Sequence, residues 1–216
     1  MTAQSRQSFH RTSAPRAIPS TLWAAGSDPI DPGDRWPAPI VSRAATEFCA
    51  PEGRVALVPG HPPTTRGALT VLPPDVAGAL ATVENLGRTA RIELGASGAG
   101  QSAELVLASL LDSNLDAVAA ADRVAELAAR VLSEGGLLVV LSRCHYSRDG
   151  VLSDPAASVV AAAQAADLLY LQHIIAAPIT GTTFPAPQTH TPDHRAHMLV
   201  HTDVFVFLNP RPTPTP

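Results

Sequence analysis

The order of apolar and polar positions predicts alternating strands and helices through the middle of the chain. Residues 55–58 and 137–141 are unbroken apolar runs, which are typical of strands buried on both faces. Residues 115–132 place apolar side chains on one helical face, and Gly135–Gly136 is expected to cap that helix. The remaining pattern predicts strands at 68–72, 90–94, 105–108, 170–175 and 204–208, and helices at 40–48, 75–86 and 156–168.

This alternation indicates a single α/β domain with a mostly parallel, doubly wound sheet. Function in such a sheet is expected at the carboxyl ends of its strands. The pattern is absent at both ends of the chain, where Ser, Thr, Pro, Gly and Arg mix without periodicity. We therefore predict a flexible arm over 1–35, a domain over 36–210 with a mobile loop at 177–200, and a proline-rich tail over 211–216.

Composition and charge narrow the function classes. All 15 basic residues among the 216 are Arg, which excludes mechanisms that need a Schiff-base or P-loop lysine. The net charge of −4 provides no general basic field, so tight unaided binding to nucleic acid is disfavoured. Cys49 and Cys144 form no metal or redox spacing, and no apolar leader or membrane-length run is present. These features predict a soluble, reduced, cytoplasmic protein.

Three segments of the second half carry a resemblance to a known family. They are A-A-R-V-L-S-E-G-G-L-L-V-V-L at 128–141, D-P-A-A-S-V-V-A-A-A-Q-A-A-D-L at 154–168 and H-T-D-V-F-V-F-L at 201–208. Their order and spacing resemble the class I S-adenosylmethionine-dependent methyltransferases, and more narrowly the actinobacterial DNA methylases and tRNA guanine methyltransferases. The resemblance implies a Rossmann-like methyltransferase sheet whose last strand runs antiparallel between its neighbours.

The resemblance also implies S-adenosylmethionine as the cofactor. Pro59 and Gly60 match the family's loop after the first strand, where glycine lets the backbone approach the cofactor. Asp75 follows the strand expected at 68–72 and matches the acidic residue that holds the cofactor's ribose. The acidic position at the end of the first strand is Val58 here, and prolines in the following loop lack N–H donors. These substitutions count against cofactor binding.

The stretch A-E-L-V-L-A-S-L-L-D-S-N at 103–114 occupies the place of the family's catalytic sequence, D-L-V-L-x-S-P-P-Y. In the family, the polar residue and the proline carbonyl accept hydrogen bonds from the target amino group, and the aromatic ring stacks on the flipped base. Ser109 is kept, and Asp112 is a second candidate acceptor. Leu110, Leu111 and Asp112 replace both prolines and the ring, which removes the rigid turn and the stacking surface.

Two main interpretations follow. The first is a degenerate methyltransferase-fold protein that acts as a non-catalytic partner or binding subunit of a nucleic-acid-modifying system, alongside a protein partner such as an active methyltransferase. The second is an active enzyme that methylates an amino group of DNA or RNA with Ser109 and Asp112. A cofactor-binding sensor without turnover is a third, weaker alternative.

Other polar clusters have simpler explanations. Residues 94–100 follow a predicted strand but precede another strand instead of a helix, so a flexible connector is favoured over a ligand loop. Cys144–His145 is interpreted as a loop, because sequence neighbours seldom act as nucleophile and base. A helix would place four histidines on one face, but Pro192 and nearby Thr residues argue against it, and no metal site is predicted. These histidines are His190, His194, His197 and His201.

Overall fold

The computed structural model describes residues 21–62, 64–66, 69–71, 75–95, 102–112, 114–146, 151–179 and 199–210. Its helices are α1 (Ala38–Phe48), α2 (Val76–Asn85), α3 (Ala117–Val131) and α4 (Ala156–Ala165). Its first strands are β1 (Leu22–Ala24), β2 (Arg54–Pro59), β3 (Thr64–Arg66), β4 (Leu69–Val71), β5 (Thr89–Ile92) and β6 (Ala103–Ser109). The later strands are β7 (Leu132–Ser142), β8 (His145–Tyr146), β9 (Leu152–Ser153), β10 (Leu169–Ala177) and β11 (Thr202–Leu208).

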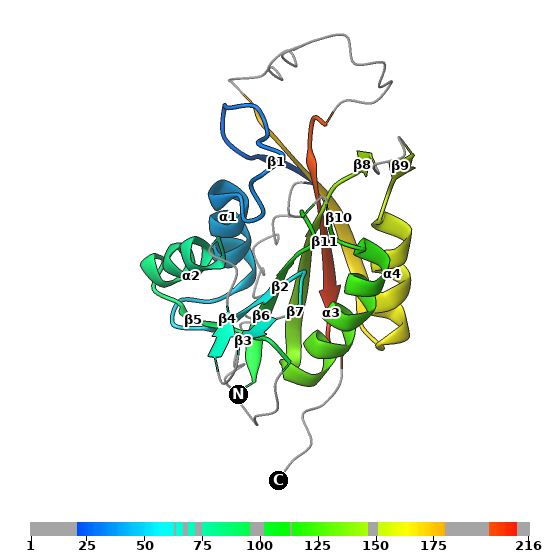
Figure 1. Cartoon of the computed structure of the whole chain (residues 1–216). Helices are drawn as coiled ribbons and strands as arrows, with labels where there is room; N and C mark the ends of the chain where they lie inside the picture. Colours follow the sequence, from blue (N-terminus) through cyan, green and yellow to red (C-terminus); the bar gives the residue numbers. More distant parts are fainter. Residues whose placement is uncertain are drawn as a thin grey trace, which may run out of the picture.

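Seven of these strands form one sheet in the order β1-β10-β11-β7-β6-β2-β5 (Figure 1). β11 runs antiparallel to both of its neighbours, β10 and β7, while the other pairs in the sheet are parallel. This topology confirms the predicted fold class, including the antiparallel last strand. The carboxyl ends of β2 and β6 are adjacent, because Pro59 pairs with Ser109.

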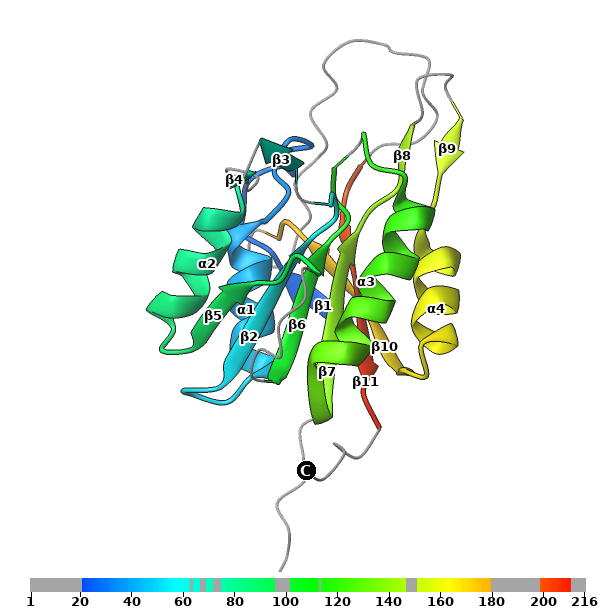
Figure 2. The same cartoon turned by 60° about the horizontal axis from the view of Figure 1, so that its bottom comes forward.

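Helices cover both faces of the sheet, with α1 and α2 on one side and α3 and α4 on the other (Figure 2). Alternate residues of the central strands enter two separate cores, as period-two side-chain alternation requires. In β6, Val106 packs in the core under α3 and α4, while Leu105 and Leu107 pack in the core under α1 and α2. Each central strand is buried on both faces, which explains the unbroken apolar runs in the sequence.

The predicted domain boundary at residue 36 differs from the structure. β1 pairs in parallel with Ile175–Ala177 of β10, and Trp23 is only 1% exposed. The Trp23 ring lies near Phe48 of α1, and the Arg43 guanidinium lies 4.9 Å from its ring centroid. Burial of a large aromatic side chain stabilises this segment where the sequence has no repeating pattern. Residues 21–35 are therefore part of the folded unit, and 1–20 lie outside the described residues.

Two other expectations need correction. The strand predicted at 68–72 is β4, which pairs only with β3 in a small hairpin and takes no part in the main sheet. Gly135–Gly136 does not cap α3, because that helix ends at Val131 and the chain passes directly into β7. Gly135 has φ of +73°, and its N–H bonds to the Asn209 carbonyl within an irregular part of the sheet. Most of the loop predicted at 177–200, and the tail 211–216, lie outside the described residues.

Candidate functional site

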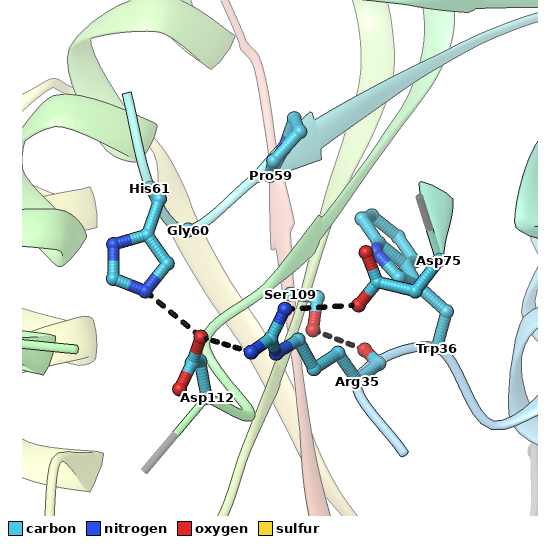
Figure 3. A pocket seen from close by; sticks show the side chains of 8 residues that line it. All are labelled: Arg35, Trp36, Pro59, Gly60, His61, Asp75, Ser109 and Asp112. Carbon is cyan, nitrogen blue, oxygen red and sulfur yellow. Dashed lines mark hydrogen bonds and ion pairs between the residues drawn. The ribbon is translucent and has the colours of Figure 1, made fainter. Parts of the chain in front are cut away.

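A pocket lies beyond the carboxyl ends of β2 and β6, where a parallel sheet is expected to hold its site (Figure 3). All five residues predicted from the sequence line it: Pro59, Gly60, Asp75, Ser109 and Asp112. Three residues outside that predicted set join them: Arg35, Trp36 and His61. The empty space, including open solvent at the mouth, is about 290 Å³. The pocket is therefore small, and charged side chains contribute to its lining.

Arg35 occupies the centre of this pocket and connects its two acidic residues (Figure 3). Its Nη2 lies 2.8 Å from Asp112 Oδ2, and its Nη1 lies 3.6 Å from Asp75 Oδ2. The Arg35 carbonyl also accepts a hydrogen bond from the Ser109 hydroxyl. One residue of the N-terminal segment thus contacts three of the candidate side chains.

Asp112 is the most strongly held acid of the site, with a side chain only 9% exposed. Its Oδ2 lies 2.9 Å from His61 Nε2, and its Oδ1 accepts a hydrogen bond from the Asn114 backbone N–H at 2.9 Å. Burial by itself would raise the pKa of Asp112, but these hydrogen bonds and the Arg35 charge together lower it. The carboxylate is therefore charged at neutral pH, and its oxygens already accept hydrogen bonds from the protein.

The residues at the end of β6, Ser109–Leu111, pack against the protein interior. Leu110 and Leu111 are 3% and 2% exposed, and they enter the cores on opposite faces of the sheet. The Ser109 hydroxyl donates to the Arg35 carbonyl and lies 3.4 Å from the Leu111 backbone nitrogen. The two leucines that replace the family's prolines thus anchor the loop without filling the pocket.

Gly60 is close to the protein's own chain. A Cβ at this position would lie 2.6 Å from the Ser109 carbonyl oxygen and 2.6 Å from Leu115 Cδ2. Arg123 donates hydrogen bonds to the carbonyls of both Pro59 and Gly60. The glycine is therefore required for the close contact between the β2 and β6 loops.

Arg143, at the end of β7, fixes the segment that carries Arg35. Its side chain is buried, and it donates hydrogen bonds to the carbonyls of Asp31, Pro32, Asp34 and Leu111 at 2.7–3.2 Å. Burial lowers the pKa of Arg143, although the nearby Asp34 and Asp31 charges oppose that shift. The N-terminal segment and the β6 loop are thus held together by one guanidinium.

The structure changes the reason for selecting Asp75. Asp75 was selected because it follows the strand predicted at 68–72, but that strand lies outside the main sheet. The outer neighbour of β2 is β5, so the acidic residue in the matching position is Glu93, directly after β5. Its N–H bonds to the Leu57 carbonyl, and its carboxylate lies near Arg91 Nε at 3.4 Å and the Gly95 N–H at 3.3 Å. Asp75 stands instead at the start of α2 and reaches the pocket from a helix. The sequence R-I-E-L-G at 91–95 is the signal that could have identified Glu93.

The other sequence candidates do not join this pocket. Within the described ranges, no three His, Cys, Asp or Glu side chains are arranged to hold a metal ion. His201 lies 3.3 Å from Asp203 Oδ1, while the three earlier histidines are outside the described residues. Burial, together with Asp154 and Asp203, raises the pKa of the Cys144 thiol, which disfavours a nucleophilic thiolate. Residues 96–101 of the glycine-rich connector are also outside the described part.

Comparisons with known proteins are limited to three-dimensional similarity. The chain matches no protein-family model and no curated protein sequence. Similar solved structures include the N-methyltransferase NodS from Bradyrhizobium japonicum WM9, at 13% identity and TM-score 0.46, covering 81% of this chain and 94% of NodS. The [4+2]-cyclase SpnF has 16% identity and TM-score 0.47, covering 87% of this chain and 88% of SpnF.

A candidate DNA modification methylase from Thermus thermophilus is also similar, at 11% identity and TM-score 0.35. The match covers 82% of this chain and spans about half, 53%, of that protein. The strand order and the antiparallel β11 of this chain carry its assignment to the Rossmann-like methyltransferase fold. No described helix is both long and apolar enough to cross a membrane.

Two features of the described pocket count against S-adenosylmethionine. Its empty space of about 290 Å³ already includes open solvent at the mouth, so the enclosed part is smaller. Arg35 lies between the carboxylates of Asp75 and Asp112, and Gly60 contacts the β6 loop. The described pocket therefore has little enclosed space for this cofactor, although Asp75 Oδ1 is buried there without a hydrogen-bond partner.

Proposed function

We propose that this chain is a cytoplasmic, non-catalytic methyltransferase-fold subunit that binds a protein partner in a nucleic-acid-modifying system. The observation that carries the proposal is Arg35, which pairs with Asp112 at 2.8 Å and accepts a hydrogen bond from the Ser109 hydroxyl at its carbonyl. Both residues that could align a target amino group are thus already bound by the protein. The fold is retained, while the groups needed for methyl transfer are engaged internally.

A calorimetric titration with S-adenosylmethionine and S-adenosylhomocysteine tests the loss of cofactor binding. We expect no binding heat with the wild-type chain at millimolar ligand. Arg35→Ala should remove the ion pairs of both carboxylates without restoring binding, because Asp112 keeps its hydrogen bonds with His61 and Asn114 and the contacts at Gly60 persist. The matched control is Arg130→Ala, which removes a 60% exposed guanidinium with only a 3.9 Å ion pair on α3.

The opposite result would support the alternative of an active methyltransferase acting on an amino group of DNA or RNA. Micromolar binding by the wild-type chain that is lost in Glu93→Gln would place a ribose contact at the end of β5. Methyl transfer to nucleic acid would then be assayed with Ser109→Ala and Asp112→Asn. Purification of the native protein without any associated protein would contradict the partner component of the proposal.

A further inference from the structure

A second, larger groove lies on the other side of the segment that carries Arg35. Its empty space is about 670 Å³, open solvent included, which exceeds that of the Arg35 pocket. The segment between β1 and α1, drawn in dark blue in Figure 1, forms one wall, and the ends of β10 and β11 contribute Ala176 and Thr202. The groove is separate from the pocket at β2 and β6, since they share no lining residue.

The groove is formed by hydrogen-bonded backbone. The Ala25 N–H bonds to the Ala177 carbonyl at 2.8 Å, and the Ile179 N–H bonds to the Gly26 carbonyl at 2.8 Å. Arg143 holds the far end of the same wall through the carbonyls of residues 31, 32 and 34. A wall fixed at both ends needs little reorganisation when it binds a ligand.

The lining combines an apolar surface with one sign of charge. Eight of its twelve residues are Ala, Gly, Pro or Ile, and Ile40 of α1 is 3% exposed. Among the described residues, its charged side chains are the three carboxylates of Asp28, Asp31 and Asp34. Asp31 and Asp34 each accept a backbone N–H from the turn. Arg143 bonds to carbonyls of the same wall, and burial lowers its pKa, although the charges of Asp34 and Asp31 oppose that shift. Its guanidinium does not line the groove, whose described charged side chains are all negative.

The carboxylates and the apolar lining of the groove favour one class of ligand over others. Nucleic acid is disfavoured, because three carboxylates repel phosphates. A second copy is also disfavoured, because each chain carries a net charge of −4. A polypeptide with an apolar side chain for the lining and cationic side chains for the carboxylates satisfies both features of the groove.

We propose that this groove is the docking site for a partner protein's segment in which an apolar side chain is flanked by Arg or Lys. The proposal rests on the function proposed above and specifies the chemistry of its partner. Opposite charge at the rim makes the association faster and sensitive to salt. The buried apolar anchor provides the contact that salt does not weaken.

The probe is a fluorescein-labelled pentapeptide with a central leucine and two arginines on each side, titrated into the full-length chain by anisotropy. The groove variant combines Asp28→Asn, Asp31→Asn and Asp34→Asn, since Asn keeps the turn acceptors and removes the charge. Its matched control, with the same loss of charge, combines Asp116→Asn, Asp122→Asn and Asp167→Asn. Asn is favoured at a helix N-cap and tolerated at positive φ, which are the environments of Asp116 and Asp167.

We expect saturable binding that weakens by about tenfold in the groove variant and stays unchanged in the control. A peptide with serine in place of the central leucine should also bind the wild-type chain more weakly, and a peptide with Glu in place of Arg should not bind it. Absence of binding at millimolar peptide, or equal losses in the two variants, would overturn the proposal. A wild-type dimer in sedimentation that dissociates in the groove variant would assign the groove to a second copy instead. Cofactor calorimetry tests the loss of cofactor binding separately, so failure of the docking proposal and failure of the proposed function are distinguishable.

Discussion

Removing the Arg143 guanidinium should destabilise the fold by a predictable amount. Arg143→Met keeps most of the aliphatic stem but deletes the donors to four backbone carbonyls. At about 1.5 kcal/mol for each hydrogen bond from a charged donor, the low end of the usual range, the four bonds sum to about 6 kcal/mol. Two effects reduce this value, because water can reach the carbonyls of the exposed residues 31 and 32, and burying the guanidinium itself costs free energy. We expect a loss of about 3 kcal/mol.

Urea unfolding followed by tryptophan fluorescence measures this loss. Trp23 and Trp36 are the chain's two tryptophans, and both are buried near the segment that Arg143 holds. Arg143→Lys should give an intermediate loss, because an ammonium with three donors cannot span four carbonyls. Arg130→Met, on the exposed face of α3, should stay within about 0.5 kcal/mol of wild type. A loss below about 1 kcal/mol for Arg143→Met, or a fully stable Arg143→Lys, would refute this reasoning.

Three further predictions concern local features. Gly60→Ala should destabilise the protein by about 1–3 kcal/mol, because the added Cβ meets the backbone. Gly78→Ala on α2, where the Cβ meets open space, should stabilise it by about 0.5–1 kcal/mol. Equal effects of the two variants in urea unfolding would contradict the close contact at Gly60. Asp116→Ala should cost about 1 kcal/mol by removing the α3 N-cap, and Asp116→Asn should restore it. Asp203→Asn should destabilise the protein most between pH 3.8 and pH 6.5, the ordinary pKa values of an Asp carboxyl and a His imidazole. Burial alone would raise the pKa of Asp203, but hydrogen bonds from two histidines lower it, so its contribution to stability disappears as the pH falls below 3.8. The hydrogen bond to Asp203 raises the pKa of His201 above 6.5, so the contribution of this histidine disappears as the pH rises through that raised pKa. A pH-independent difference in unfolding free energy would exclude this coupling.

Strands and helices with strong periodicity were predictable from the sequence. The apolar runs at 55–58 and 137–141 lie in β2 and β7, and the amphipathic pattern at 115–132 is α3. The prediction was wrong where pairing decides the outcome. β4 has the composition of a strand, but its partner is β3, and local sequence does not state which strand a segment will pair with.

Part of the candidate site was also predictable. Pro59, Gly60, Ser109 and Asp112 meet because they follow neighbouring parallel strands, whose carboxyl ends share one edge of the sheet. Arg35 was assigned to the arm, because a single Arg among prolines and glycines has no periodic signal. Its contacts with Asp75 and Asp112 span tens of residues along the chain, so only the folded structure brings them together.

The sequence by itself determined the α/β class, the main buried strands and the strand-end residues of the pocket, because hydrophobic periodicity and turn chemistry act between neighbours in the chain. The tertiary structure alone decided that β5 lies beside β2, that β1 pairs with β10 in the sheet, and that Arg35 lies between two carboxylates. These outcomes depend on the burial and charge pairing of residues far apart in the chain. Such interactions act only once the chain has folded, so the order of residues does not display them.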